Sequence, residues 1–305
     1  MVAMLACALL VLGGYRLFYP VSEINDEGSG MDEQTPDDAA EVPPQTDAPA
    51  VIAGLDADYH IDYENGTIPI GDLPIGARVV DPSWEWEFRT GDNYWGSGKV
   101  TTVTWIVVAK DHYDGLEPHV TLLADELIGK HTFDNSTTRG TPFGSNHWGD
   151  SGTANASHGL RPWLNSTGIY SNGGFYRAFS ESFKAAVLAT TVPNKEWKNG
   201  TAYSTEDYVF LPSTTELGDS VHFQTYRIGS VYPYFSGADD AKRLAYLGGE
   251  AWWYVTRSPA SNLGFFVRFV HLAGQFRGNY ATDVHYGVRP AMNLKSEILV
   301  SEIRN

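Results

Sequence analysis

Apolar and polar positions alternate along much of the chain after residue 66, and this pattern predicts short β-strands. Residues 84–88 alternate aromatic and acidic side chains, a period of two that is typical of a strand with one buried face. Residues 103–110 and 120–123 are apolar, β-branched runs on either side of a turn-rich segment. Further strand patterns occur at 208–212, 251–256, 265–272 and 288–294.

Helical spacing of apolar residues is confined to a few short segments. Residues 180–188 predict a helix because Ser180 suits the N-cap position, and Phe183 and Val187 follow at helical spacing. Residues 159–165 predict a second helix, whose proline lies early enough to be tolerated in the first turn. Together these patterns predict an α+β domain with short antiparallel strands, two main helices and much irregular loop.

The start of the chain has a different character. Residues 1–20 are predominantly apolar and come close to the length of about 20 residues that a membrane span requires. An uncleaved signal-anchor whose true start lies upstream of Met1 and a cleaved secretory signal both remain open, and a lipoprotein attachment through Cys7 is a weaker third interpretation. All three place the rest of the chain outside the cytoplasm. We expect an extracellular protein at the cell surface, tethered to the membrane through this segment.

Charge is concentrated in the segment that follows. Thirteen acidic residues and no Lys or Arg lie between Val21 and Glu64, so the first 64 residues, with Arg16, carry −12 of the formal −16. The negative charges of such a segment repel one another, and it contains few large apolar side chains that folding could bury. This predicts an acidic, disordered stalk over 21–65 and a folded domain over 66–305. The domain is nearly balanced in charge and has no basic stripe, so nucleic acid is not an expected partner. We expect a monomer.

The chain shows none of the common catalytic motifs. Its one cysteine lies in the apolar start, so the domain has no disulfide, thiolate ligand or cysteine nucleophile. The sequence contains no His-Glu-x-x-His metal motif and no Gly-x-Ser-x-Gly nucleophile elbow. We therefore predict no catalytic residue, no metal and no cofactor.

Residues 261–285 stand out from the two blocks that flank them, 251–259 and 287–294. The segment mixes aromatic residues with His, Arg, Asn and Asp among small residues, a composition typical of recognition surfaces. It holds too many large aromatics for a loop-rich segment to bury, which predicts an exposed contact patch. The candidate ligand-binding residues are Trp253, Asn262, Phe265, Phe266, Phe269, His271, Phe276, Arg277, Asn279, Tyr280, Asp283 and His285. Arginines of the flanking blocks, such as Arg257 and Arg289, are expected to be mainly structural.

Several blocks of the chain resemble a bacterial domain family of unknown function found in secreted or anchored proteins. The blocks are Trp105, 161–165, 210–216, 252–259 and 287–291. That family resembles the C-type-lectin fold of formylglycine-generating enzymes and of the variable proteins of diversity-generating retroelements. The resemblance implies a single C-type-lectin-like domain with a hairpin-rich ligand face. The codon changes that such retroelements introduce into variable proteins never produce Lys, Glu, Gln, Met or Trp. Of these five residue types, residues 261–285 contain only Gln275.

These observations favour a non-catalytic adhesion or recognition protein whose ligand is an extracellular protein or glycan. Formylglycine-generating enzymes depend on a pair of cysteines, which this domain lacks. One alternative is a cysteine-independent enzyme of that superfamily, which requires a cluster of His and carboxylate metal ligands. The other alternative is a structural cell-surface module.

Overall fold

The fold is described from a computed structural model of the chain. The structure describes residues 57–87, 89–90, 100–134, 144–149, 159–171, 173–219, 227–260 and 263–303. All of them belong to one compact unit, Val51–Asn305.

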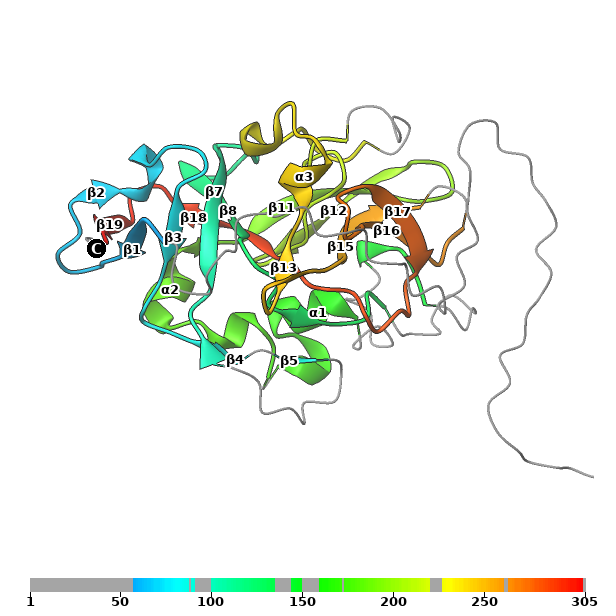
Figure 1. Ribbon diagram of the computed structural model, residues 1–305, viewed down its shortest axis with the longest axis horizontal. Coiled ribbons are helices and arrows are strands. Elements are labelled where there is room, and N and C mark those ends of the chain that lie inside the picture. Colours follow the sequence, from blue (N-terminus) through cyan, green and yellow to red (C-terminus); the bar gives the residue numbers. More distant parts are fainter. Residues whose placement is uncertain are drawn as a thin grey trace, which may run out of the picture. The chain divides into compact units, whose positions relative to one another are not determined.

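One eight-stranded sheet forms the centre of the domain (Figure 1). Its strands, in spatial order, are β10 (Val187–Leu188), β18 (Ala291–Lys295), β8 (His119–Ala124), β7 (Thr104–Lys110), β3 (Arg78–Val80), β1 (Tyr59–Ile61), β19 (Leu299–Glu302) and β2 (Ile68–Pro69). All neighbouring pairs are antiparallel except β1 and β3, so the sheet is mixed. The strands β7, β8 and β18 are almost entirely buried, which agrees with the apolar residues that dominate their sequences.

Smaller sheets and short helices surround this sheet. A three-stranded antiparallel sheet contains β15 (Tyr254–Pro259), β16 (Phe266–Val270) and β17 (Phe276–Tyr280). Two-stranded pairs are formed by β4 (Trp86–Glu87) with β6 (Val100–Thr101), β5 (Arg89–Thr90) with β9 (Gly129–Lys130), β11 (Thr190–Lys195) with β12 (Ala202–Asp207), and β13 (Tyr246–Leu247) with β14 (Glu250–Ala251). The α-helices are α1 (Leu160–Asn165), α2 (Glu181–Ala186) and α3 (Asp240–Arg243), and the 3-10 helices include η1 (Ile70–Asp72), η3 (Gly168–Tyr170), η4 (Tyr176–Ala178) and η6 (Pro233–Phe235).

Aromatic side chains fill the core between the central sheet and the short helices. The alternation at residues 84–88 has the predicted effect, because Trp84 and Trp86 are buried while Glu85 is exposed. The ring of Trp84 packs 5.5 Å, between centroids, from Phe183 of α2. Helix α2 begins as predicted, with the Ser180 hydroxyl accepting a hydrogen bond from the Phe183 amide at 3.1 Å.

The expected fold class is wrong. The protein is mostly β, with 35% of residues in strands and 14% in helices, and its large sheet contains eight strands. Both predicted main helices exist, but each is only six residues long, and strands too short to show a period of two raise the β content. Neither the α+β class nor the C-type-lectin fold is supported.

Two expectations about the start of the chain also change. Strand β1 pairs with β19 and β3, so the ordered domain includes residues that precede the expected start at residue 66. Across the described ranges, no helix has the length and apolar character needed to cross a membrane. The expected membrane attachment falls on residues 1–20, which lie outside the described ranges, so no described residue supports it.

Candidate functional site

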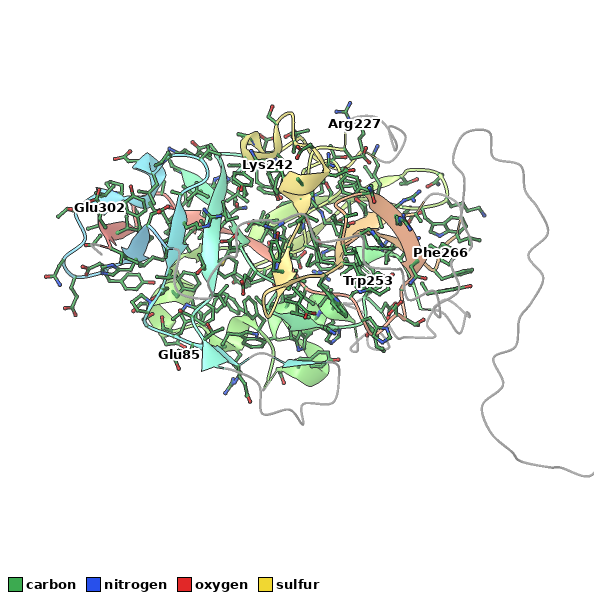
Figure 2. The ribbon with its side chains drawn as sticks, in the orientation of Figure 1. Glu85, Arg227, Lys242, Trp253, Phe266 and Glu302 are labelled. Carbon is green, nitrogen blue, oxygen red and sulfur yellow. The ribbon has the colours of Figure 1, made fainter. Side chains whose placement is uncertain are left out.

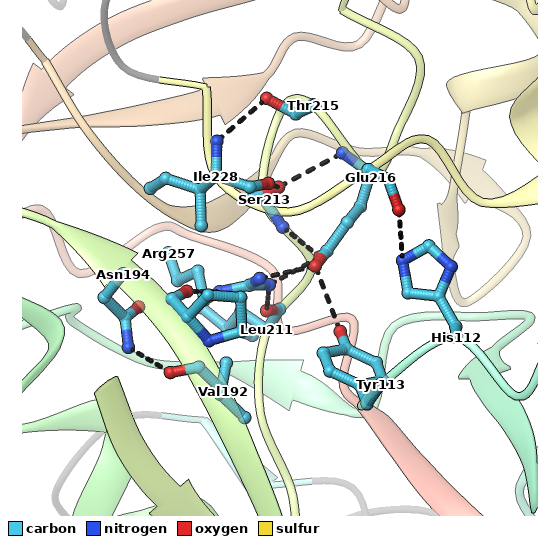
Figure 3. A network of polar contacts seen from close by, with 12 residues as sticks. His112, Tyr113, Val192, Asn194, Leu211, Ser213, Thr215, Glu216, Ile228 and Arg257 are labelled. Carbon is cyan, nitrogen blue, oxygen red and sulfur yellow. Dashed lines mark hydrogen bonds and ion pairs between the residues drawn. The ribbon is translucent and has the colours of Figure 1, made fainter. Parts of the chain in front are cut away.

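A buried ion pair joins two of the sequence blocks that carry the family resemblance (Figure 3). The guanidinium of Arg257, in β15, donates two hydrogen bonds of 2.5 Å to the two carboxylate oxygens of Glu216. Both side chains are completely buried. Arg257 Nη1 also donates to the Leu211 carbonyl oxygen at 2.6 Å, and its Nε donates to the Pro193 carbonyl oxygen at 3.3 Å. Arg257 thus connects β15 with the 211–216 turn and with β11.

The carboxylate of Glu216 is held by its own turn as well. The Ser213 amide donates to Glu216 Oε2 at 2.8 Å, and the Glu216 amide donates to the Ser213 hydroxyl at 3.1 Å. This reciprocal arrangement is that of a capping box, and the Ser-x-x-Glu spacing in the sequence indicates it. The hydroxyls of Tyr113 and Tyr232 donate to the same carboxylate at 3.0 and 3.1 Å.

Electrostatics keep Glu216 ionised inside the protein. Burial by itself raises the pKa of Glu216, but the attraction of Arg257 and the hydrogen bonds outweigh burial and leave the pKa lowered. Burial raises the pKa of Tyr113, and the adjacent carboxylate raises it further, so this phenol stays protonated and donates. The cluster is closed to solvent and fully paired, so its role is to hold the fold together.

Arg289 makes a second buried connection of a different kind. Its guanidinium donates to the carbonyl oxygens of Ala124 at 2.9 Å and of Asp125 and Leu244 at 3.4 Å. It also lies 3.3 Å from the Tyr254 hydroxyl. Arg257 and Arg289 are therefore structural, as the sequence predicts, and they fix the sheet that carries residues 266–280.

The alternation of side chains along β16 and β17 divides the predicted patch between two faces. Phe266 pairs with Tyr280, and two residues farther along each strand Arg268 pairs with Gly278, so these four share one face. Phe269 pairs with Arg277 on the opposite face. The sheet therefore does not bring the candidate ligand-binding residues together in one contiguous surface.

The first face ends in a group of aromatic rings, of which Figure 2 labels Phe266. The rings of Phe265 and Tyr280 are nearly parallel, with an interplanar angle of 8° and centroids 5.9 Å apart. The ring of Phe266 stands edge-on to Tyr280, 4.7 Å away. Phe265 and Phe266 are half-buried and Tyr280 is 40% exposed, so the rings present surface to solvent.

Three further aromatic residues border this group, and the sequence reasoning missed them. Trp197, in the turn between β11 and β12, packs so closely on Gly264 that a Cβ there would lie 2.7 Å from the indole nitrogen. Beside it, His147 and Tyr203 stack with centroids 4.1 Å apart and an angle of 8°. We call this surface, formed by His147, Trp197, Tyr203, Phe265, Phe266 and Tyr280, the aromatic end. No local pattern links these positions, because three distant segments supply them.

A buried asparagine holds two of those segments together. The Asn146 amide nitrogen donates to the carbonyl oxygens of Leu263 at 2.9 Å and of Phe266 at 2.8 Å. The Asn146 backbone amide donates to the Gly264 carbonyl oxygen at 2.9 Å. Asn146 is 1% exposed, so these bonds form away from water and position the 263–266 turn beside the loop that carries His147.

The opposite face, which we call the polar face, is formed by Trp253, His271, Arg277, Asn279, Asp283 and His285. Asn279 donates to the Asp283 carboxylate at 2.7 Å, and His285 Nδ1 lies 2.9 Å from the same carboxylate. Burial lowers the pKa of His271, and the positive charge of Arg277 lowers it further. Arg277 and His285 are exposed, so this face is polar and accessible.

Three of the candidate ligand-binding residues lie elsewhere. Phe269 is buried beneath the polar face, where its ring packs 5.2 Å from Trp253, so it supports the surface and is not part of it. Phe276 shares the face of Tyr280 but lies four residues away along β17, with the Arg243 guanidinium 4.9 Å above its ring. Asn262 lies outside the described residues.

The described ranges contain no group of three His, Cys, Asp or Glu side chains placed to hold a metal ion. Comparison with known proteins gives one result: a family model described as a domain of unknown function, DUF6273, matches residues 118–296. No curated protein matches the chain. No solved structure matches it either. The matched residues include the 211–216 turn, Arg257 and both faces of the three-stranded sheet. Because they make up more than half of the 305 residues, the chain belongs to the DUF6273 family.

Proposed function

We propose that the protein is a non-catalytic recognition protein that acts outside the cytoplasm and binds an extracellular protein or glycan. The observation that carries the proposal is the accessible surface of residues 263–285. This segment presents a group of aromatic rings on one face of a three-stranded sheet and a polar surface on the other. Aromatic and Arg side chains of this kind are enriched where proteins bind other proteins.

The rigidity of the sheet also supports recognition. The ion pair of Arg257 and the contact of Arg289 with the Tyr254 hydroxyl fix β15. Strand β15 pairs with β16 across one register shift, and β16 pairs with β17 in continuous register. A surface that is ordered before binding loses less conformational entropy on association. The apolar start of the chain and the acidic segment after it support an extracytoplasmic location.

An array experiment with the full chain tests this function. The purified protein is applied to arrays of extracellular proteins and of oligosaccharides, beside a polar-face variant, Arg277→Ala/Asn279→Ala, and an aromatic-end variant, Phe265→Ala/Tyr280→Ala. Tyr208→Ala is the matched control, because Tyr208 is also 40% exposed and stacks on a neighbouring tyrosine, Tyr176.

We expect specific binding that the control retains and that one of the two surface variants loses. Circular dichroism and thermal unfolding establish that each variant is folded. Binding that survives in both variants would show that residues 263–285 are not the recognition surface. The absence of any specific binding on either array would contradict a recognition function.

A further inference from the structure

We infer that β17 binds an extended strand of a protein partner along its outer edge, the edge that faces away from β16, an inference that rests on the proposed recognition function and specifies the ligand as a peptide segment. Strand β17 is the outermost strand of the three-stranded sheet, beyond β16 (Figure 1). A strand in this position presents backbone amides and carbonyl oxygens with which another strand can pair.

Hydrogen bonds at the two ends of β17 show which backbone groups point to the outer edge. The Ala281 amide donates to the Phe265 carbonyl oxygen at 2.8 Å, and the His271 amide donates to the Gln275 carbonyl oxygen at 2.8 Å. Gln275 and Ala281 therefore face β16. Because consecutive residues of a strand direct their backbone groups to opposite edges, the odd-numbered residues from 275 to 281 face β16 and the even-numbered residues face the outer edge.

Two of these even-numbered residues have backbone groups available for pairing. The carbonyl oxygen of Tyr280 already accepts a hydrogen bond from the Asp283 amide at 3.2 Å, which closes that end of the edge. For Phe276 and Gly278, no group in the described ranges accepts a hydrogen bond from the amide or donates one to the carbonyl oxygen. Gly278 is exposed and Phe276 is half-buried. Two amides and two carbonyl oxygens are therefore open to a partner strand.

The two edges of the central sheet are protected against pairing, whereas β17 is not. Strand β2 is two residues long and includes Pro69, and β10 is also two residues long. Short edge strands, proline and bulges are devices by which natural sheets prevent strand addition. Strand β17 has five residues and no proline, and it pairs with β16 without a register shift. Its length and regularity favour a binding role for this edge.

An extended peptide with an acidic side chain fits this edge. In an antiparallel arrangement, Phe276 and Gly278 each exchange two hydrogen bonds with one residue of the added strand. Arg277 lies between them, at the position where the side chains of paired strands come closest. Arg277 is exposed and carries the only charge of β17, so an Asp or Glu opposite it forms a favourable cross-strand pair. The partner is therefore a proline-free, extended segment that carries an acidic residue.

Peptide binding by the full chain tests the inference. An array of nine-residue peptides is probed with the purified protein, and the best-bound peptide is resynthesised with one backbone amide N-methylated at a time. Alternate amides of an added strand point toward β17, so N-methylation is expected to weaken binding at least tenfold at every second central position and to have little effect between them. We expect acidic peptides to be preferred, and Arg277→Glu to shift the preference to basic peptides.

Hydrogen exchange followed by NMR locates the peptide on the native protein. In the free chain the amides of Phe276 and Gly278 are expected to exchange rapidly, because they lack an acceptor among the described residues. The bound peptide is expected to slow both at least tenfold. The amides of Arg277 and Asn279 face β16 and are expected to exchange as before.

Substitutions isolate the contribution of the outward amide. Gly278→Pro removes this amide without a loss from the ladder with β16, and Gly278→Ala adds a Cβ but keeps the amide. Peptide binding is expected to be at least tenfold weaker in Gly278→Pro than in Gly278→Ala. Ser204→Pro is the matched control: the Glu196 amide donates to the Thr201 carbonyl oxygen, so Ser204 faces the outer edge of β12, and its replacement is expected to leave peptide binding unchanged. The N-methylation and exchange measurements use the native protein and decide the inference if Gly278→Pro does not fold.

The outcomes separate this inference from the wider function. An N-methylation effect that does not alternate overturns strand addition, as does equal binding by folded Gly278→Pro and Gly278→Ala. Slow exchange of the Phe276 and Gly278 amides in the free chain overturns it as well, because a second copy or another segment of the chain then occupies the edge. Binding to a protein or an oligosaccharide on the arrays, without binding to any peptide, overturns strand addition and leaves the recognition function standing. The absence of binding to proteins, oligosaccharides and peptides overturns both.

Discussion

Replacing Arg257 by methionine tests whether the buried ion pair fixes the sheet that carries both faces. The substitution removes two 2.5 Å hydrogen bonds to Glu216 and the donors to two carbonyl oxygens, at a site with no solvent access. Removing one partner of a buried pair leaves the other charge uncompensated and costs about 3–5 kcal/mol. Because domains unfold with about 5–15 kcal/mol, this loss is a large part of the total.

Urea unfolding followed by tryptophan fluorescence measures the loss. With a slope of about 3 kcal/mol per molar urea, the midpoint is expected to fall by about 1–1.7 M at pH 7. Lys184→Met is the matched control, because Lys184 pairs with Glu181 on the surface and its loss is expected to leave the midpoint unchanged. The double variant Arg257→Met/Glu216→Leu removes both charges and is expected to recover part of the stability. A loss below about 1 kcal/mol for the single variant would refute the reasoning.

The pH dependence gives a second, independent signature of the same pair. In the native protein the pKa of Glu216 is lowered because Arg257 and the hydrogen bonds outweigh burial. The ionised Glu216 carboxylate therefore stabilises the folded state above its ordinary pKa of 4.5, and this stabilisation is lost as the pH falls below that value. In Arg257→Met burial remains and raises the pKa of Glu216. The ionised carboxylate therefore lowers the unfolding free energy of the variant at pH 7, and this loss becomes smaller as the carboxylate is protonated toward pH 4.5. The difference in unfolding free energy between the two proteins should therefore narrow from pH 7 to pH 4.5. A constant difference would show that Glu216 does not titrate differently in them.

Two further substitutions test the supports of the aromatic end and of β17. Asn146→Asp places a carboxylate against the carbonyl oxygens of Leu263 and Phe266. We expect the unfolding free energy, measured by urea titration, to fall by at least about 2 kcal/mol, which is the cost of an unpaired buried polar group. An unchanged unfolding free energy would contradict the role of Asn146. Gly274 has a φ of +86°, and in Gly274→Ala the added Cβ overlaps the backbone of Asp240. Gly248→Ala is the control, because Gly248 also has a positive φ, +62°, but open space around it. We expect Gly274→Ala to lower the melting temperature well beyond the effect of Gly248→Ala, and equal effects would contradict the overlap.

The sequence predicts local features of this fold better than their assembly. The apolar run at 103–110 becomes β7, and Ser180 caps α2, because both depend on residues adjacent in the chain. The strand predicted at 208–212 fails: Phe210 makes only an isolated bridge with β18, and the chain then turns so that Glu216 meets Arg257. That turn is stabilised by a contact 41 residues away in the sequence, which no local pattern reports. The wrong fold class has the same origin, since strands of two or three residues show no period.

The candidate site illustrates the same limit at the level of side chains. Of the aromatic and polar groups that the composition of residues 261–285 predicts to be accessible, Tyr280 and Arg277 are exposed, whereas Phe269 is buried. Which of them share a face depends on the register of Phe266 with Tyr280, and register depends on pairing between strands. The contribution of Trp197 depends on how the β11–β12 hairpin packs against the 263–266 turn.

Arg257 connects the fold with the candidate site. Its side chain contacts the 211–216 turn, and its Nε reaches the Pro193 carbonyl oxygen in β11, the strand that leads toward Trp197. Its backbone belongs to β15, which pairs with β16 and so carries Phe266 and, through β17, Tyr280. One buried side chain therefore fixes the hairpin and the sheet relative to each other, and with them two of the three segments that form the aromatic end. On this reasoning the residues of the flanking blocks contribute to recognition by positioning the rings, and a ligand contacts the segment that they support.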